Sequence, residues 1–565
     1  MGRTVAIGLQ DFGDLIQKGY FYIDKTSFIK EWWENGDSVT LINRPRRFGK
    51  TLNMSMVEHF FSVNYAGQRE LFQGLSVWSE KAYREIQGTY PVISLSFANV
   101  KETNYQNAKE RICQLLTDLY VKYHFLRECD WMTESDKVFF DSVCTNMPEV
   151  VATLAVYKLS DFLFRYYGKK VIILLDEYDT PMQEAYVDGY SDELTAFTRN
   201  LFNASFKTNP WLERALMTGI TRVSRESVFS DLNNLEVVTT TSDKYETSFG
   251  FTEEEVFAAL DECELGEKKD DVKRWYDGFI FGTHKDIYNP WSVLNFLDKG
   301  RLSTYWANTS SNTLIGRLLR EGNRRIKEKF EMLLRGETIR TSVDEQIVYS
   351  QLEGNETAVW SLLLASGYLK VLNYEKEEDL DEGEEPQYEL MLTNYEVTRM
   401  FGSMVRGWFN EAKEDYNDFI SAMLHDDLEE MNAYMNRVAL GTFSYFDTGK
   451  NPGEEEPERF YHGFVLGLMV DLQKRYIITS NRESGFGRYD VILEPKKPDM
   501  DDAIILEFKV HNRQKEKSLE ETAQMALKQI EQKKYAEQLI AKGICKEHIR
   551  RYGFAFEGKK VLIKR

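Results

Sequence analysis

The chain has little cysteine and no long apolar run. Its 565 residues include 5 cysteines, an odd number, and none has the C-x-x-C or Cys/His spacing of a zinc site. Reduced thiols are therefore expected, not disulfides or bound zinc. No apolar run approaches about 18 residues, and the N-terminus lacks the charged and then apolar order of a signal segment. These absences exclude a membrane-spanning helix and predict a soluble cytoplasmic protein without a membrane partner.

Positive charge is also scarce, because Asp and Glu outnumber Lys and Arg and give a formal net charge of -20. Such an acidic balance opposes indiscriminate binding of nucleic acid, so any contact with DNA must be local. The 42% hydrophobic and 13% aromatic content excludes a disordered chain. The length predicts about three domains, and neither an internal repeat nor a targeting motif is present.

A glycine is missing from a phosphate-binding pattern that is otherwise present. An apolar run, Val39 to Ile42, leads into the basic turn RPRRFGKT at 44–51, and an amphipathic run follows to Phe61. Backbone N–H groups at a helix start are unpaired, and the helix dipole favours negative charge there, so a nucleoside triphosphate is the expected ligand. The residues of this turn predicted to bind ATP are Arg44, Arg47, Gly49, Lys50 and Thr51.

Two of these side chains have defined expected roles. Lys50 would reach the β and γ phosphates, and the Thr51 hydroxyl would ligate Mg²⁺. Arg44 stands where the G-x-x-x-x-G-K-[ST] pattern has its first glycine. Since glycine supplies backbone freedom at that position, Arg44 leaves the conformation of the loop open.

A second element fits the same site. The run from Val171 to Glu177 is continuously apolar and ends in two acids, as expected of a buried parallel strand that delivers carboxylates to its C-terminal edge. Asp176 would hold the Mg²⁺ through water, and Glu177 would polarise the attacking water. The alternative is a buried strand whose acids only start the next helix. The presence of Lys50 and Thr51 favours the nucleotide site.

Apolar runs that begin at Val39, Pro91, Val171 and Leu212 are separated by helical stretches, one of them at 104–124, and so predict a three-layer α/β sheet. At the end of the fourth run and just after it, Thr218 or Thr221 could sense the γ-phosphate. Arg222 and Arg225 could neutralise charge in the transition state, in cis or in a neighbouring subunit of a homo-oligomer. Ordinary surface positions are the alternative for the arginines.

The segment before the phosphate loop contains a short aromatic run, Tyr20 to Ile23, followed by Asp24. We predict a strand over the aromatic run and an N-cap at Asp24 for the next helix. The segment either folds over the nucleotide base or packs at the edge of the domain.

From Phe251 the pattern becomes mostly helical. FTEEEVFAALDECEL has helical spacing, WYDGFIFG at 275–282 contains a Gly/aromatic turn, and YNPWSVLNFL at 288–297 predicts a helix started by proline. The acidic run at 375–386 predicts a solvated loop. The region is either a winged-helix lid that binds DNA or a packing and transmission domain, and we favour the second interpretation.

The C-terminal part combines a helix with several strands. PERFYHGFVLGLMVDL predicts a helix that carries Glu458 in its first turn. Strands are predicted at 476–480, at 489–493 with Asp490, and over AIILEFKV with Glu507 and Lys509. Residues two apart on a strand share one face, and burying an acid and an ammonium on an apolar strand is costly unless both are used.

This arrangement suits metal-assisted cleavage of phosphodiester bonds. Carboxylates would hold one or two Mg²⁺, Lys509 would position the nucleophile or offset charge, and Gln529 on the helix ALKQIEQKKYAEQL would bond to the lysine or the phosphate. From Lys509 to Arg565 the chain has 15 Lys and Arg against 7 Asp and Glu, a local basic patch for nucleic acid. A structural ion pair of Glu507 with Lys509 or Arg488 is the alternative. The candidate carboxylates are Asp490, Glu507, Glu458 and Glu483.

Taken together, blocks at both ends of the chain resemble a bacterial and archaeal family of fused proteins, in which an AAA-ATPase-like domain precedes a nuclease-like domain of the PD-(D/E)XK superfamily. The N-terminal blocks are GYFYIDKT, NRPRRFGKT, LLDEYDTP, TGITRVS, WYDGF and YNPWS. The C-terminal blocks are FSYFDTG, RFYHGFVLG, SNRESGFGRYDVILEP, ILEFKV and ALKQI.

The resemblance implies an α/β multidomain protein. Its domains would be a P-loop three-layer α/β ATPase domain at 1–250, a mostly helical, winged-helix-like middle at 251–450, and a restriction-endonuclease-like α/β domain at 451–565. It implies that Arg44 belongs to the family's own form of the phosphate loop. It also implies a nuclease-like core of Glu458, Asp490, Glu507, Lys509 and Gln529.

Three functions follow as hypotheses. In the first, ATP binding or hydrolysis gates a Mg²⁺-dependent nuclease that acts on DNA in preference to RNA. In the second, the protein is a nucleotide-dependent switch or scaffold whose C-terminal domain binds nucleic acid or protein without cleavage. In the third, a winged-helix regulator has an ATPase input. The intact acid pair and lysine favour the first.

Overall fold

The computed structural model describes residues 3–221, 229, 232–307, 313–344, 352, 355–375, 380–381, 384–407, 413–442, 467–468, 470–482, 488–512, 515–557 and 560–565. The chain forms two compact units. The first unit consists of Met1–Ile315 and Thr338–Thr398, and the second of Gly316–Glu337 and Arg399–Arg565. None of the helices in the described ranges is long and apolar enough to cross a membrane.

The first unit is built on a parallel sheet of five strands in the order β2-β3-β4-β1-β5. Every residue of β1 and β3 is buried, as expected where helices cover both faces of a parallel sheet. The strands are β1 (Val39–Asn43), β2 (Val92–Ser96), β3 (Val171–Asp176), β4 (Leu212–Gly219) and β5 (Leu235–Val238).

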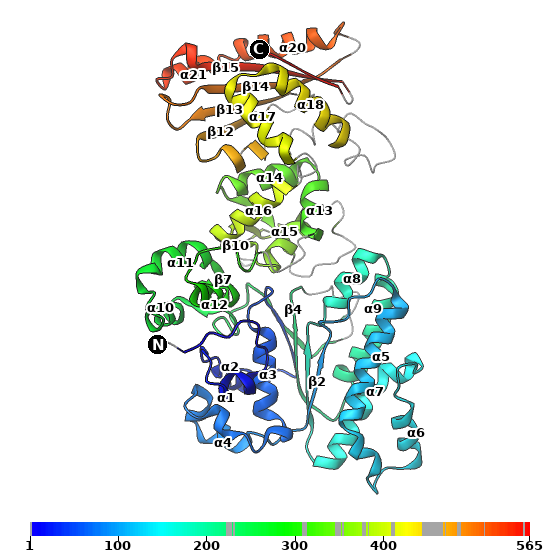
Figure 1. The fold of residues 1–565 in the computed structure, drawn as a ribbon. Coiled ribbons are helices and arrows are strands. Elements are labelled where there is room, and N and C mark those ends of the chain that lie inside the picture. The colour runs from blue at the N-terminus through cyan, green and yellow to red at the C-terminus, as the bar shows by residue number, and fades with distance from the viewer. Residues whose placement is uncertain are drawn as a thin grey trace. The chain divides into compact units, whose positions relative to one another are not determined.

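Helices cover the two faces of this sheet in separate groups (Figure 1). The helices α1 to α4 lie on one side and α5 to α9 on the other, which gives the predicted three layers. Aromatic residues of the first group, among them Phe28, Trp32 and Phe60, pack with Ile42, Ile172 and other strand residues into one core. The helices are α1 (Phe12–Gln17), α2 (Ser27–Asn35), α3 (Lys50–Phe61), α4 (Lys81–Ile86), α5 (Tyr105–Lys122), α6 (Glu134–Ser142), α7 (Glu149–Tyr167), α8 (Thr180–Asp188) and α9 (Ser191–Phe202).

Two predictions for the segment before the phosphate loop are wrong. Residues 20–25 form no strand, although the amide of Phe21 donates to the carbonyl of Thr4. Asp24 is not the N-cap of α2. Its carboxylate accepts from the amide and hydroxyl of Thr26 and from Ser76, and Thr26 precedes the helix.

The rest of the first unit contains two small antiparallel sheets among helices. One has the order β6-β8-β7 and packs with α10, α11 and α12, the last of which starts at the predicted proline. The other has the order β10-β11-β9 and lies beside α15. The elements are β6 (Phe251–Thr252), α10 (Glu253–Glu262), α11 (Lys269–Tyr276), β7 (Phe279–Phe281), β8 (His284–Tyr288), α12 (Pro290–Lys299), β9 (Ile339–Ser342), α15 (Glu356–Ala365), β10 (Leu369–Tyr374) and β11 (Gln387–Leu392). The winged-helix assignment stays a prediction.

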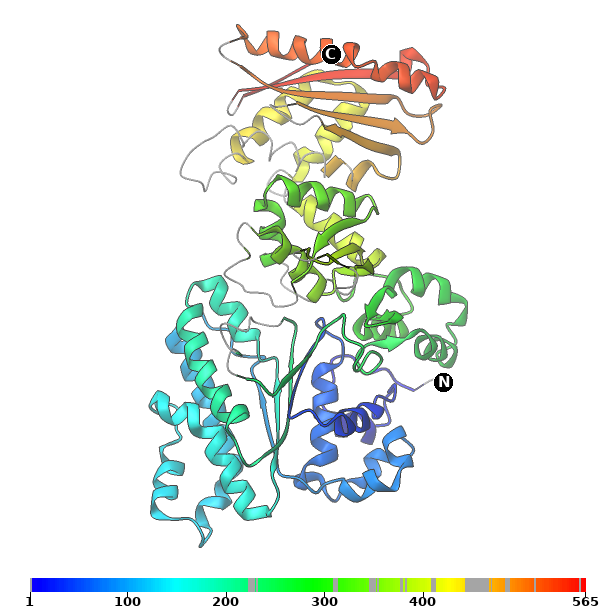
Figure 2. The same ribbon diagram turned by 180° about the vertical axis from the view of Figure 1, so that it is seen from behind.

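The second unit is built on a mixed sheet in the order β12-β13-β14-β15-β16, in which only β14 and β15 run parallel. Helix α20 packs on one face, and α17 and α18 supply the core of the other (Figure 2). The elements are α14 (Arg324–Leu334), α17 (Lys413–His425), α18 (Leu428–Thr442), β12 (Tyr476–Arg482), β13 (Arg488–Pro495), β14 (Ala503–Val510), α20 (Leu519–Gln532), α21 (Tyr535–Ala541), β15 (Ile549–Glu557) and β16 (Lys560–Lys564).

Helices α13 (Thr313–Glu321) and α16 (Tyr395–Gly407) each have residues in both units. Helices α17 and α18 share a core with the C-terminal sheet, so this unit includes residues upstream of the predicted domain at 451–565. The predicted helix ALKQIEQKKYAEQL is two helices, because Lys534 between them has a left-handed backbone with φ of 57°.

Candidate nucleotide and metal sites

The phosphate loop follows β1 at the edge of the sheet where the parallel strands end. Strand β4 lies between β1 and β3, so the loop, the acids at the end of β3 and Thr218 at the end of β4 meet there. Ligands of open α/β sheets bind outside the carboxyl ends of the strands. Two residues of the loop adopt positive φ, Gly49 with 80° and Arg47 with 65°. Gly49 immediately precedes α3, so the loop turns directly into a helix N-terminus.

Lys50 is the first residue of α3 and is 5% exposed. Its ammonium donates to the carbonyls of Arg44 and Pro45, both at 2.8 Å. Burial lowers the pKa of Lys50, and the carboxylates of Glu177 and Asp176 partly oppose that effect. The Lys50 ammonium is therefore bound by carbonyls of the loop and lies close to the acids at the end of β3.

Asp176 joins two of the predicted residues. Its carboxylate accepts from the hydroxyl of Thr51 at 2.8 Å and from the hydroxyl of Thr218. Burial raises the pKa of Asp176, whereas these two hydrogen bonds act to lower it. A threonine hydroxyl beside a buried carboxylate is a donor set of hard oxygens, which suits Mg²⁺. These residues fit the predicted metal position of a nucleotide site.

Glu177 has a left-handed backbone, with φ of 50°, although it is not a glycine. Its amide donates to the Thr218 hydroxyl at 3.2 Å, and the hydroxyl of Thr180 donates to its carboxylate at 3.2 Å. Such a conformation costs about 1 to 3 kcal/mol and persists only where neighbouring contacts impose it. Here it places Glu177 in the wall of the cavity next to the phosphate loop.

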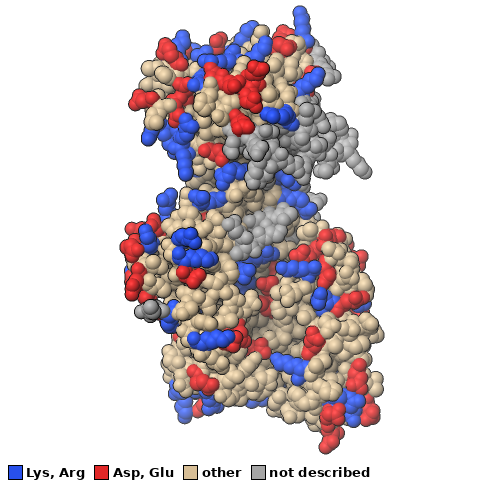
Figure 3. Space-filling model, in the orientation of Figure 1, with Lys and Arg blue, Asp and Glu red and all other residues tan. Residues whose placement is uncertain are grey.

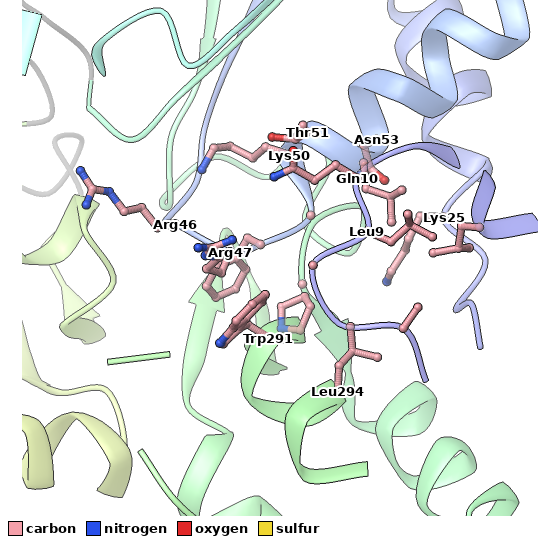
Figure 4. A pocket seen from close by; sticks show the side chains of 18 of the residues that line it. Leu9, Gln10, Lys25, Arg46, Arg47, Lys50, Thr51, Asn53, Trp291 and Leu294 are labelled. Carbon is pink, nitrogen blue, oxygen red and sulfur yellow. The ribbon is translucent and has the colours of Figure 1, made fainter. Parts of the chain in front are cut away.

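That cavity has a volume of about 430 Å³ and lies entirely in the first unit. Lys50 and Thr51 lie at one end, and Leu9, Gln10 and Lys25 come from the N-terminal segment (Figure 4). Phe21, Tyr22 and Ile23 line it as well, so the segment predicted either to fold over the nucleotide base or to pack at the edge of the domain reaches this cavity. On the other side stand Trp291 and Leu294 of α12.

Arg44 is fully buried and is not among the residues that line the cavity. Its guanidinium bonds to the carbonyls of Asn43 and Thr239 and lies over the ring of Phe281, with 4.3 Å to the centroid. The Arg44 side chain therefore stabilises the loop through contacts that lie outside the cavity wall. Arg47 does line the cavity and lies over Trp291.

Thr218 near the end of β4 and Thr221 just after the strand also have fixed partners. The Thr218 hydroxyl donates to the Asp176 carboxylate and accepts from the Glu177 amide. The Thr221 amide and hydroxyl both donate to Asp179. Neither threonine lines the cavity. The other two predicted residues of this stretch, Arg222 and Arg225, lie outside the described residues.

In the second unit, the register brings two predicted acids together. Asp490 of β13 is directly opposite Glu507 of β14, and Gly553 of β15 is next to Glu507 on the other side. Directly opposite residues of an antiparallel pair lie on the same face, with Cβ atoms about 5 Å apart. The side chain of Asp490 is outside the described part of the structure, and so are Glu458 and Glu483.

Glu507 is 0% exposed, and both of its carboxylate oxygens lack a hydrogen-bond partner. It follows Ala503 and Ile505 on the face that α20 and α21 cover. Buried charges in proteins are normally paired or bound to a metal. A buried carboxylate with two free oxygens, opposite a second acid in register, fits a divalent cation, although the described side chains include no group of three His, Cys, Asp or Glu placed to hold one.

Helix α20 lies very close to the sheet beside Glu507. A Cβ added to Gly553 would lie 2.5 Å from the carbonyl oxygen of Ala523 in α20. Gln529, also on α20, is buried, and its side-chain nitrogen has no partner. The predicted residues Glu507 and Gln529 are thus buried polar groups with unused hydrogen-bonding atoms.

Lys509 has a neighbour that the sequence did not indicate. Its ammonium is 4.0 Å from the carboxylate of Glu516, and both side chains are largely buried. Glu516 also accepts from the Thr522 hydroxyl at 2.7 Å and the Asn512 amide at 3.0 Å, and His511 is 3.4 Å away. Burial by itself raises the pKa of Glu516, but these hydrogen bonds and charges outweigh it, so that its pKa is lowered.

Replacement of Glu516 by glutamine is expected to destabilise the second unit in a pH-dependent manner. A carboxyl whose pKa is lowered on folding contributes stability above its unfolded pKa, and that contribution is lost as the pH falls through the folded pKa. The difference in melting temperature between the wild type and Glu516→Gln should therefore be largest near neutral pH and shrink below the ordinary value of 4.5. Thermal unfolding from pH 3 to 8 measures it, and a constant difference would contradict the ion pair.

Comparison with known proteins separates the same two parts of the chain. Residues 6–229 match a family described as predicted AAA-ATPase, and residues 456–565 match the PD-(D/E)XK nuclease superfamily. The chain is also similar to an uncharacterized protein encoded in the vnfD 5′ region of Azotobacter chroococcum mcd 1. The two are 26% identical over 403 residues, which is 70% of this chain and 68% of that protein.

Both matches agree with the architecture. The first covers strands β1 to β4 of the parallel sheet with the phosphate loop, and the second covers the mixed sheet that carries Glu507 and Lys509. The chain therefore combines an N-terminal domain of the predicted AAA-ATPase family with a C-terminal domain of the PD-(D/E)XK nuclease superfamily.

Proposed function

We propose that the protein binds and hydrolyses ATP in its first unit and cleaves phosphodiester bonds of nucleic acid, DNA in preference to RNA, in its second. ATP would gate the cleavage. The ATP half is supported by the placement of Lys50, Thr51 and Glu177 around one cavity, with Asp176 behind Thr51. The cavity is large enough for a nucleotide base, since small-molecule sites begin at about 300 Å³.

Each residue of the nucleotide site has a role in this proposal. Lys50 would exchange the loop carbonyls for the β and γ phosphates, which accept stronger, charge-assisted hydrogen bonds. Thr51 and Asp176 would hold Mg²⁺. Glu177 would orient and polarise the attacking water, and its contacts with Thr180 and Thr218 fix it for that task.

The nuclease half is carried by one observation, the fully buried and unpaired carboxylate of Glu507. With Asp490 it would hold Mg²⁺, which would polarise the phosphate and lower the pKa of a bound water. Lys509, kept in place by Glu516, would offset the charge that develops on the phosphate. Gln529 would donate its free N–H groups to the phosphate or to a water.

Nucleic acid would have to be bound locally. Acidic and basic side chains are interspersed over the face of the molecule drawn in Figure 3, and the net charge of the chain is -20. The local excess of Lys and Arg in the C-terminal segment supplies positive charge to the unit that carries Glu507. Gating is part of the proposal because one chain carries both the nucleotide site and the nuclease-like domain.

The proposal is tested with the full chain and supercoiled plasmid. We expect nicking or linearisation that requires Mg²⁺ or Mn²⁺ and whose rate changes when ATP is added. A slowly hydrolysed ATP analogue separates the effect of binding from that of hydrolysis, and single-stranded DNA and RNA of one sequence test substrate preference. Absence of scission with every metal and nucleotide, together with ATP affinity that depends on Lys50, would overturn the nuclease and leave a nucleotide-dependent scaffold.

A further inference from the structure

The phosphate loop is enclosed by residues that come much later in the chain. Phe48, inside the loop, packs on Phe279 and Phe281 of β7, with ring centroids 4.7 and 5.5 Å apart. Phe281 also lies under the guanidinium of Arg44. The loop that lacks its first glycine is thus supported on one side by β7.

Two tryptophans contact the two residues between Pro45 and Phe48. The indole N–H of Trp306, which is buried, donates to the carbonyl of Arg46 at 2.9 Å. The guanidinium of Arg47 lies over the ring of Trp291, 4.4 Å from the centroid (Figure 4). Arg47 is the residue of the loop with the strained backbone, φ of 65°. Both contacts therefore stabilise the part of the loop in which a non-glycine residue, Arg47, has an unfavourable left-handed backbone.

One buried carboxylate connects these tryptophans. Glu396, at the start of α16, is 0% exposed and accepts from the backbone amide of Trp306 at 2.7 Å and from the hydroxyl of Ser292 at 2.8 Å. Ser292 follows Trp291 directly in α12. Burial raises the pKa of Glu396 to about 7, against the effect of its hydrogen-bond donors. A fully buried acid with such partners is a costly arrangement, and here it fixes both segments that contact the loop.

We propose that Trp306 and Trp291, held by Glu396, are positioning residues of the ATP site, which fix the backbone at Arg46 and Arg47 so that the loop can bind phosphate. The inference rests on the proposed ATP site. It explains how a loop with arginine instead of the first glycine keeps one conformation. In the simpler alternative, the three residues only pack the domain and do not influence the loop.

The decisive variant is Trp306→Phe, which keeps an aromatic ring at this position but removes the indole N–H and reduces the side-chain volume. Its matched control is Trp32→Phe, because Trp32 is also fully buried in the first unit and loses an equivalent bond, from its indole N–H to Thr40 at 3.2 Å. Trp32 is not in the cavity wall. Both variants should lower the melting temperature to a similar degree. A difference between them in hydrogen exchange or in the Kd for ATP therefore reports on the loop and not on general stability.

Two measurements are made on each variant. Hydrogen exchange of the peptide that covers residues 43–52, without nucleotide, should be faster in Trp306→Phe and unchanged in Trp32→Phe. The Kd for ATP should rise up to about tenfold in Trp306→Phe alone, the loss of one hydrogen bond. Equal exchange and equal affinity in the two variants would overturn the inference.

Glu396 offers a second test. Glu396→Ala should raise the Kd for ATP and speed exchange of the loop more than Trp306→Phe does, whereas Glu396→Gln should restore most of both, because the amide oxygen can still accept from Trp306. If the wild type binds no ATP, the proposed function fails. Exchange of the loop without nucleotide still decides the inference in that case, since faster exchange in Trp306→Phe supports it and unchanged exchange overturns it.

Discussion

Replacement of Glu507 by glutamine is expected to abolish metal-dependent cleavage and, at the same time, to raise the melting temperature of the second unit. The carboxylate is fully buried and has no hydrogen-bond partner for either oxygen. Without a bound cation, its charge destabilises the fold, and a neutral amide of the same shape removes most of that cost. A gain of about 1 kcal/mol would raise the melting temperature of a unit of this size by about 2 to 4 °C.

The loss of activity should be large. A catalytic metal contributes several kcal/mol of charge stabilisation in the transition state, and each 1.36 kcal/mol changes the rate about tenfold, so cleavage should fall at least about a thousandfold. Mg²⁺ or Mn²⁺ should raise the melting temperature of the wild type, because the ion binds the folded state, and should leave Glu507→Gln unchanged. Cleavage of plasmid and differential scanning calorimetry with and without the ion measure both effects.

Glu494→Gln is the matched control. Glu494 lies on the neighbouring strand β13 and pairs with Lys542 near the surface, so the same chemical change there should alter neither cleavage nor the response to metal. Lower thermal stability in Glu507→Gln would show that the carboxylate has a stabilising partner in the folded protein and would argue against a cation site. Full cleavage activity in that variant would remove Glu507 from the proposed mechanism.

Much of the fold follows from apolar runs that are long enough to show their period. The strands β1 to β4 are largely apolar runs, and all four were predicted from the sequence alone. Other strands were missed. The six short strands β6 to β11 lie in the stretch at 251–450 that was predicted to be mostly helical, and three more were missed for identifiable reasons. Leu235–Val238 is too short to show a pattern, and Ile549–Glu557 and Lys560–Lys564 contain so many basic residues that they were interpreted only as a phosphate-facing patch.

Some residues of the candidate sites could likewise be predicted from the sequence, and others could not. Lys50 and Thr51 follow the loop after β1, and Asp176 and Glu177 lie at the end of β3, so the convergence of parallel strand ends brings them close together. Glu516 was not predicted, because it lies in the charged stretch between β14 and α20, where the sequence does not indicate which glutamate is buried. Trp306 and Glu396 contact partners 90 to 260 residues away, and a single sequence contains no pattern for such contacts.

Replacement of Glu177 by glutamine is expected to leave ATP bound but unhydrolysed. A general base contributes about 10² to 10⁴ to the rate, so turnover should fall by that factor while the Kd for ATP stays within about twofold. The backbone of Glu177 is fixed by the bond from its amide to Thr218, which does not depend on the side chain. The amide can also keep the bond from Thr180, so the geometry of the site should persist.

Lys50→Ala should have the opposite profile. The ammonium is buried and has only uncharged loop carbonyls as hydrogen-bond acceptors, so its removal takes away the positive charge that would face the phosphates. Affinity for ATP should fall about a hundredfold or more, as expected for the loss of two charge-assisted hydrogen bonds. Equilibrium binding of ATP and release of phosphate, measured on the same samples, distinguish a binding defect from a chemical one.

Glu58→Gln serves as control for both variants, because Glu58 is on α3 with Lys50 but pairs with Lys122 at 3.5 Å, outside the cavity wall. It should bind and hydrolyse ATP like the wild type. If ATP gates cleavage by its presence, Glu177→Gln with ATP should cleave plasmid at the stimulated rate and Lys50→Ala at the basal rate. If hydrolysis is required, both variants should cleave at the basal rate. Turnover in Glu177→Gln equal to that of the wild type would mean that another group activates the water.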